Sequence, residues 1–189
     1  SEMCIRDRYI KDESIRKNIN IRILNRVKPV VEDGTITGGN ACLTHDGAAL
    51  VVLVSEDRIK YFNTHRIRIS HEACAGVDPN YPPVGAAAAV KKVLGKAEIP
   101  AGMIDAFEIN EAFAAKILAF MKELNISGNT INMFGGALAY GHPYGASGAI
   151  IVLHLMEIMK RRKLRYGIAG IGVAGGQGAA AMLESDGDF

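Results

Sequence analysis

From near residue 66 onward the chain alternates regularly between strand-like and helix-like segments, and this alternation limits the folds that it can adopt. The segments follow the order β-α-β-α-β-α-β-β, with periods typical of each type. This order predicts an α/β fold in which helices cover both faces of a mixed, mostly parallel five-stranded sheet. The last two strand-like segments, near 166–172 and 178–183, are separated by a glycine-rich turn. They favour an antiparallel hairpin at or near one edge of the sheet.

Three helical segments follow the earlier strand-like segments, which lie near 66–70, 105–109 and 130–134. A helix over roughly 84–94 is built from small residues, one that begins at Asn110 carries an apolar face, and one over 149–159 is apolar nearly all round. We therefore expect the last of these helices to be buried in the middle of the fold. The basic run 160–163 that follows it either complements the negative end of the helix or binds an anionic ligand.

The chain upstream of residue 66 gives weaker signals. Apolar residues between Ile19 and Val27 share one helical face. Residues 48–55 (AALVVLVS) are apolar on both faces, which predicts a buried strand of a covered sheet, and a short charged helix is expected over 55–62. Residues 1–18 have no apolar period, so we expect little order there.

The composition excludes several classes of protein but does not identify the function. With 49% hydrophobic and 22% charged residues, the 189-residue chain has the composition of a globular protein. A formal net charge of +2 provides no basic field for nucleic acid. No apolar run approaches the ~18 residues of a membrane helix and no apolar leader is present, so we expect a cytoplasmic protein without a membrane partner. The cysteines form no CxxC pair, which favours reduced thiols.

Three loop motifs fall where strands of the predicted sheet end, and ligands of open α/β sheets bind beyond the carboxyl ends of the strands. The first is 141–145 (GHPYG), in which Pro143 keeps His142 out of helical geometry just before a helix. A histidine held out on a rigid loop is suited to donate a hydrogen bond or to act as a general acid or base. The alternative is a loop histidine that is satisfied by backbone carbonyls.

The other two motifs each have a chemical and a structural interpretation. The amide of Asn110 either holds a water or a carbonyl oxygen, or caps the following helix with Glu111 in its first turn. The segment 174–178 (AGGQG) either offers backbone N–H groups to an oxyanion or forms a hairpin turn. No nucleotide-binding or metal motif is visible, so we expect no metal and no nucleotide cofactor. The histidines without metal-ligand spacing are His45, His65, His71 and His154.

Together these motifs are far more specific than any one of them, because they occur in the order and spacing of the thiolases. The matching stretches are GNAC (39–42), DGAA (46–49), GVDP (76–79), NEAFA (110–114), GGALAYGHPYGASGA (135–149) and GIAGIGVAGGQGA (167–179). The chain therefore resembles a thiolase over about residues 19–185. The resemblance divides it into a part over 1–63, which holds an N-terminal tail and the last strand and helix of the thiolase N-terminal half, and a thiolase C-terminal domain over 64–189.

The resemblance implies two α/β halves packed in a homodimer or tetramer that transfers acyl groups by a reversible Claisen condensation. By position, His142 would activate a nucleophilic cysteine of the N-terminal half and bind the thioester oxygen. Asn110 would hold a water at the same oxyanion site. Cys42 lies in a loop that would contact the pantetheine of coenzyme A, where relatives usually have serine. An acyl-CoA thioester is thus the expected substrate, and no cofactor is needed.

The chain departs from the thiolase pattern in several places. The half that bears the nucleophile is absent, so the chain by itself is expected to be inactive. Gly172 occupies the position of the second catalytic cysteine, which moves the α-proton, and Ala174 replaces a glycine whose N–H serves a second oxyanion site. Some thiolases carry a cysteine where Ala112 stands. Residues 1–8 (SEMCIRDR) match nothing in the family, and nothing around Cys4 resembles a nucleophile motif.

Two functions therefore compete at this stage. His142 and Asn110 favour a thiolase-family acyl-CoA acyltransferase, represented by its C-terminal portion. Gly172 favours a thiolase-like protein that binds acyl-CoA without condensing it. A third interpretation is a half that serves only subunit packing.

Overall fold

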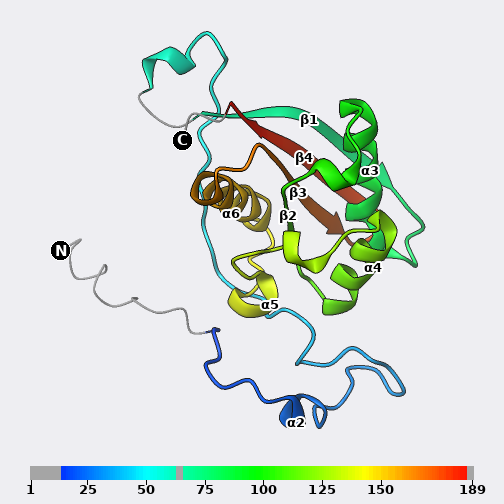
Figure 1. Cartoon of the computed structure of the whole chain (residues 1–189). Coiled ribbons are helices and arrows are strands. Elements are labelled where there is room, and N and C mark those ends of the chain that lie inside the picture. Colours follow the sequence, from blue (N-terminus) through cyan, green and yellow to red (C-terminus); the bar gives the residue numbers. More distant parts are fainter. Residues whose placement is uncertain (1–13, 63–65, 187–189) are drawn as a thin grey trace, which may run out of the picture.

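The sheet predicted from the alternation is present and organises the chain from residue 66 onward (Figure 1). A computed structural model describes residues 14–62 and 66–186. The strands are β1 (Ile67–Gly76), β2 (Ala106–Ile109), β3 (Tyr166–Val173) and β4 (Gln177–Ser185). They lie in the order β1-β4-β3-β2, with β4 antiparallel to both of its neighbours and β2 parallel to β3. The expected mixed α/β sheet is confirmed.

The sheet differs from the prediction in strand count and strand direction. It has four strands in the described residues, and one of its three pairings is parallel. Residues 130–134 contribute only an isolated bridge from Ile131 to Phe107. The side-chain amide of Asn132 takes the place of a backbone partner for Ile109. It accepts from the N–H of Ile109 at 2.7 Å and donates to the carbonyl oxygen of Ile109 at 2.9 Å. The β3–β4 hairpin forms as expected, but it occupies the two central positions because β1 pairs with the outer side of β4.

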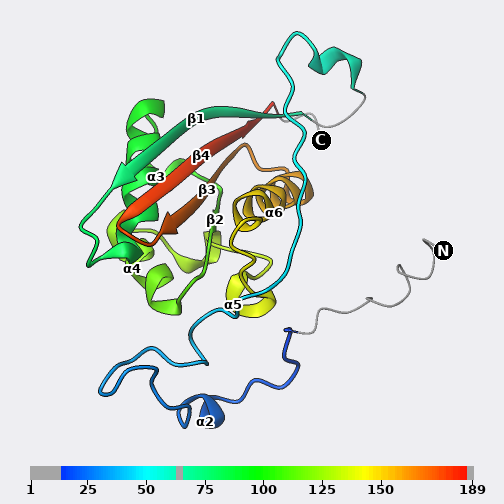
Figure 2. The same ribbon diagram turned by 180° about the vertical axis from the view of Figure 1, so that it is seen from behind.

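Helices cover both faces of the sheet because its residues alternate between two hydrophobic cores (Figures 1 and 2). Phe107 of β2 faces the core under α3 and α4, whereas its neighbour Ala106 faces the core under α6. Ile168 and Ala169 of β3 divide in the same way. The helices are α2 (Ile21–Leu24), α3 (Gly85–Ala97), α4 (Ala114–Leu124), α5 (Ala137–Tyr140) and α6 (Ser147–Arg162), with short 3₁₀ helices η1 (Ile59–Tyr61), η2 (Pro82–Val84), η3 (Ala101–Met103) and η4 (Gly128–Thr130).

Helix α6 is buried on one face rather than all round. Its buried apolar residues are Ile151, Leu155, Ile158 and Met159, and the other apolar side chains are half-buried. The helix ends at Lys163, which adopts a left-handed conformation, and the preceding basic residues lie in its last turn. Their position agrees with positive charge that complements the negative helix end.

The described residues before 62 do not form the predicted strand. Residues 48–55 have no regular secondary structure and no strand partner within the described part of the chain, and Leu50 is 80% exposed. An apolar run becomes a strand only where a neighbour satisfies its backbone groups. The expected helix near Ile19–Val27 is reduced to the four residues of α2, none of which is buried. The expected helix over 55–62 is reduced to the three residues of η1. Residues 1–13 lie outside the described part of the chain.

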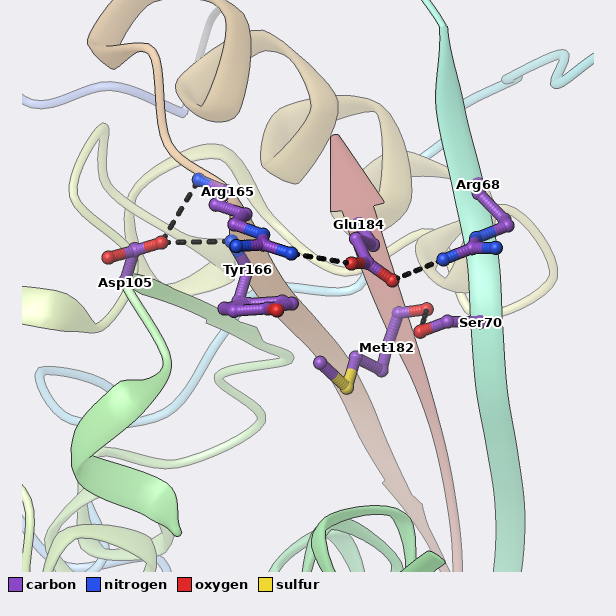
Figure 3. Close-up of polar contacts among 7 residues, drawn as sticks. All are labelled: Arg68, Ser70, Asp105, Arg165, Tyr166, Met182 and Glu184. Carbon is purple, nitrogen blue, oxygen red and sulfur yellow. Dashed lines mark hydrogen bonds and ion pairs between the residues drawn. The ribbon is translucent and has the colours of Figure 1, made fainter. Parts of the chain in front are cut away.

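The amino ends of β1, β2 and β3 are joined by polar side chains (Figure 3). Glu184, near the end of β4, lies between two arginines, 2.6 Å from Arg68 and 3.6 Å from Arg165. One carboxylate oxygen of Asp105 accepts from the backbone N–H groups of Arg165 and Tyr166, at 3.0 and 2.8 Å. These contacts fix the register of the strands at the end of the sheet opposite the candidate site. Within the described residues, no helix has the length and apolar character to cross a bilayer.

Candidate active site

The candidate site is built at the carboxyl ends of β2 and β3, where an extended segment joins two loops. The backbone N–H of Cys42 donates to the carbonyl of Ala112 at 3.0 Å, and the N–H of His142 donates to the carbonyl of Leu43 at 2.7 Å. The N–H of Ala114, the first residue of α4, donates to Asn40 at 2.9 Å. The segment 40–44 therefore holds the loop after β2 and the GHPYG loop side by side, although they are far apart in sequence.

His142 and Asn110 face each other at this site. The amide nitrogen Nδ2 of Asn110 lies 3.0 Å from Nε2 of His142. On the other side of the ring, Nδ1 lies 2.6 Å from the hydroxyl oxygen of Ser147. The Ser147 hydroxyl donates to the carbonyl of Pro143 at 3.0 Å, so its oxygen accepts from Nδ1–H. This network assigns the neutral tautomer with a lone pair at Nε2.

The surroundings of His142 keep its imidazole neutral at pH 7. The side chain is buried, with 8% of the residue exposed. Burial lowers the pKa of His142, and the charge of Lys116 lowers it further. The ring of Tyr144 meets it edge-on, with 4.6 Å between centroids. Gly141 has φ of 92°, and a Cβ there would lie 2.7 Å from His45, so the loop requires glycine at this turn.

A cavity of about 500 Å³ opens beside His142. Cys42, Gly172 and Ala174, which the sequence singled out, line this cavity together with His142. Asn110 is 2% exposed and is not part of the lining; it supports His142 from within the fold. The remaining lining residues are Pro82, Pro83, Ala112, Phe113, Lys116, Tyr144, Ile171 and Val173.

The structural interpretation of Asn110 as a helix cap is wrong. Helix α4 begins at Ala114, and Phe113 is its N-cap residue. The N–H of Asn110 continues the sheet by donating to Gly170 at 3.0 Å, which leaves the side chain free to reach His142. Glu111 does not act on the first turn of α4 either: its carboxylate accepts from Asn132 at 2.7 Å and from the N–H of Leu138 at 3.1 Å.

Three residues of the site were not found from sequence. Ser147 orients His142, Tyr144 packs on it, and Lys116 lies in the cavity wall with only 3% of its surface exposed. A lysine in the middle of the apolar run after Phe113 was the available signal, because lysine is rarely buried. Among the described residues, no group of three or more His, Cys, Asp or Glu side chains is placed to hold a metal ion, and His65 lies outside them.

The fold and the site define an α/β protein with a histidine–asparagine pair at the carboxyl edge of its sheet. The family model for the thiolase C-terminal domain matches residues 63–185, and that for the thiolase N-terminal domain matches residues 5–57. The chain belongs to the thiolase family. The second match begins at residue 5, so the expectation that residues 1–8 have no counterpart in the family is wrong for part of that segment.

The relatives agree with this assignment. VraB of Staphylococcus epidermidis, an acetyl-CoA C-acetyltransferase by name, is 39% identical over 177 residues, which cover 93% of this chain and 46% of that protein. The crystal structure of the Bacillus anthracis acetyl-CoA acetyltransferase superposes with a TM-score of 0.89 at 40% identity, and covers 93% of this chain and 45% of its own. The crystal structure of human mitochondrial 3-ketoacyl-CoA thiolase in complex with CoA superposes with a TM-score of 0.85 at 36% identity, and the match covers 92% of this chain and 45% of that one. The chain thus spans about half the length of these relatives.

Proposed function

We propose that this chain is the C-terminal portion of an acyl-CoA acyltransferase, which condenses acyl-CoA thioesters or cleaves 3-ketoacyl-CoA by a Claisen reaction. The observation that carries the proposal is the pair of His142 and Asn110, whose Nε2 and Nδ2 atoms lie 3.0 Å apart beside the cavity. A site that holds a thioester oxygen needs convergent hydrogen-bond donors in a buried setting. His142 meets that need once its imidazole is protonated, and a water held by the buried amide of Asn110 would be the second donor.

The neutral imidazole supports an earlier step of the reaction at the same atom, Nε2. Its lone pair at Nε2 accepts the proton of a thiol, which activates the sulfur as a nucleophile. The resulting imidazolium then donates to the oxygen of the thioester, beside the water that Asn110 would hold. Ser147 keeps the ring in the orientation that both steps need. The reactive cysteine of this scheme belongs to a thiolase N-terminal half.

Two further residues of the cavity are proposed to contact the acyl-CoA ligand. Cys42 and Ala174 line the cavity, so we assign Cys42 to contact with the pantetheine of coenzyme A and the N–H of Ala174 to the second oxyanion site. The human relative whose structure contains CoA supports coenzyme A as the ligand class. A homodimer or tetramer is part of the same proposal. A second candidate, acyl-CoA binding without condensation, is favoured by the absence of a side chain at Gly172.

Ligand binding can be tested on the chain itself with its own internal control. Cys42 lines the cavity, whereas Cys74 is exposed on β1 away from it. We expect CoA or acetyl-CoA to slow the alkylation of Cys42 by iodoacetamide several-fold without changing the rate at Cys74, as measured by peptide mass spectrometry. Equal rates at Cys42 with and without saturating CoA, on a protein shown by circular dichroism to be folded, would contradict the proposal.

Catalysis is tested in a version that also carries an N-terminal half with a nucleophilic cysteine. We expect His142→Ala to lower the cleavage of acetoacetyl-CoA by about 10²–10⁴-fold, the usual cost of removing an acid–base group. Protection of Cys42 by CoA should persist in this variant. Protection without turnover in the unmodified protein would favour the second candidate.

A further inference from the structure

The space left by the glycine at residue 172 is occupied by a lysine from another element. A Cβ built on Gly172 would lie 3.2 Å from Nζ of Lys116 and 3.4 Å from its Cε. The amino group of Lys116 also lies 3.5 Å from the carbonyl oxygen of Gly172. The end of this side chain therefore stands where a side chain at residue 172 would extend into the cavity.

Lys116 is buried without a carboxylate partner. It is 3% exposed and forms no ion pair within the described residues, and its hydrogen bond to the carbonyl oxygen of Gly172 is long, at 3.5 Å. It also lies in the first turn of α4, where the helix dipole opposes a positive charge. Few lysines are kept in such a position for stability, because an unpaired ammonium loses its hydration on burial.

The same surroundings make the amine available as a base. Burial lowers the pKa of Lys116 to about 8, and the neighbouring Cys42 acts in the opposite direction. The other titratable groups that line the cavity are Cys42, His142 and Tyr144. Burial raises the pKa of Cys42, so its thiol stays protonated, and His142 is engaged by Asn110 and Ser147. Lys116 is the group whose end lies at residue 172.

We propose that Lys116 moves the α-proton of the bound acyl-CoA, in the place of a side chain at residue 172. This inference rests on the proposed function. In the condensing direction the neutral amine takes the proton, so that the C–H bond breaks and an N–H bond forms. The electron pair moves onto the thioester oxygen and then forms the bond to the acyl group of the cysteine, whose thiolate leaves and takes the proton back from Lys116. In the cleaving direction the ammonium returns the proton to carbon.

The direct test is the exchange of the methyl hydrogens of acetyl-CoA with D₂O, measured by mass spectrometry, because exchange needs the base and the oxyanion site but no acyl transfer. We expect the 189-residue chain to exchange acetyl-CoA faster than buffer does, with a rate that rises with pH and levels off above about 8. Lys116→Met should lower the rate by about 10²–10⁴-fold. Lys116→Arg, which keeps the charge but supplies no base, should lower it as much. Lys122→Met, on the exposed side of α4, is the control and should leave the rate unchanged.

Two further measurements make the outcome decisive. Acetyl-CoA should protect Cys42 from alkylation equally in the unmodified chain and in Lys116→Met, which shows that binding survives. Gly172→Cys combined with Lys116→Met should restore at least part of the exchange. Exchange at the unmodified rate in Lys116→Met or Lys116→Arg, or protection without any exchange in the unmodified chain, would overturn the role of Lys116 and leave the proposed binding intact. Loss of protection in the unmodified chain would instead remove the proposed function, and this inference with it.

Discussion

The two ends of the sheet hold their polar groups in opposite ways. At the amino ends of the parallel-running strands, Glu184 lies between two arginines and Asp105 accepts from two backbone N–H groups (Figure 3). At the carboxyl ends, Lys116 is buried beside a carbonyl oxygen, and His142 and Asn110 are buried against each other. Paired charges and buried titratable groups thus lie at opposite ends of the same strands. One end satisfies its charges, and the other keeps groups whose protonation state burial can shift.

The largest effect is expected where the backbone itself is crowded at the carboxyl end. A Cβ on Gly178, at the start of β4, would overlap the carbonyl oxygen of Gly85 at the start of α3. Because the three atoms nearest to this Cβ all belong to the backbone, we expect Gly178→Ala to lower the free energy of unfolding by about 3 kcal/mol or more. Urea titration followed by circular dichroism measures it. Gly102→Ala, where a Cβ would meet nothing within 4 Å, is the control; equal midpoints for the two variants would contradict the crowding.

Removing the buried amine should stabilise the protein. The folded-state pKa of Lys116 is lowered from 10.5 to about 8, so the unfolded chain binds more protons between these values and folding is penalised fully below pH 8. We expect Lys116→Met to raise the free energy of unfolding by up to about 3 kcal/mol at pH 7, because each unit of the pKa difference between 10.5 and about 8 corresponds to about 1.36 kcal/mol. The gain should shrink as pH rises from 8 towards 10.5. Urea titrations at several pH values test this.

The matched control for this prediction is Lys122→Met on the exposed side of the same helix. It should change the free energy of unfolding by less than about 0.5 kcal/mol. A Lys116→Met variant that is less stable than the unmodified chain at pH 7, or whose gain does not vary with pH, would show that the carboxyl end is as well paired as the amino end.

The contrast between the two ends also explains what could be read from sequence. The strands β1 to β4 were predictable because their residues meet local rules: apolar residues that alternate between two cores, and a glycine-rich turn before Gln177. The position of His142 was predictable because proline and glycine constrain its loop locally. The rule that ligands bind beyond the carboxyl ends of strands, together with the resemblance to the thiolases, indicated that His142 and Asn110 share one site.

The features that were missed depend on partners far away in sequence. The run 48–55 has the composition of a buried strand, yet Val52 is 71% exposed because no described strand pairs with it. The strand expected at 130–134 gave way to a single side chain, Asn132, which bonds to both backbone groups of Ile109. The burial of Lys116 against Gly172 joins a helix to a strand and has no signature in either segment.

At the amino end, a moderate loss is expected from the carboxylate that receives two backbone donors. Asp105→Ala leaves the N–H groups of Arg165 and Tyr166 without this acceptor, and we expect it to lower the free energy of unfolding by about 1–2 kcal/mol. Asp105→Asn keeps an oxygen that accepts from both groups, so its loss should be smaller. Equal losses for the two variants in urea titrations would show that the charge, rather than the hydrogen bonds, matters at this residue.

The smallest effect is expected for the ion pairs of Glu184. Glu184→Gln keeps the shape of the side chain but removes the charge between Arg68 and Arg165, whose side chains are 59% and 67% exposed. Because exposed partners are well solvated, we expect a loss of only about 0.5–1 kcal/mol in the free energy of unfolding. Glu157→Gln, which removes the i,i+4 partner of Arg161 on α6, is the control, with an expected loss of about 0.3 kcal/mol.

The carboxylate of Glu184 is 16% exposed and that of Glu157 is 46% exposed, so 1 M salt should remove the effect at Glu157 and leave part of it at Glu184. If salt removed both effects equally, the charges of the amino end would be no better protected than a surface pair, and the contrast between the two ends would rest on Asp105 alone.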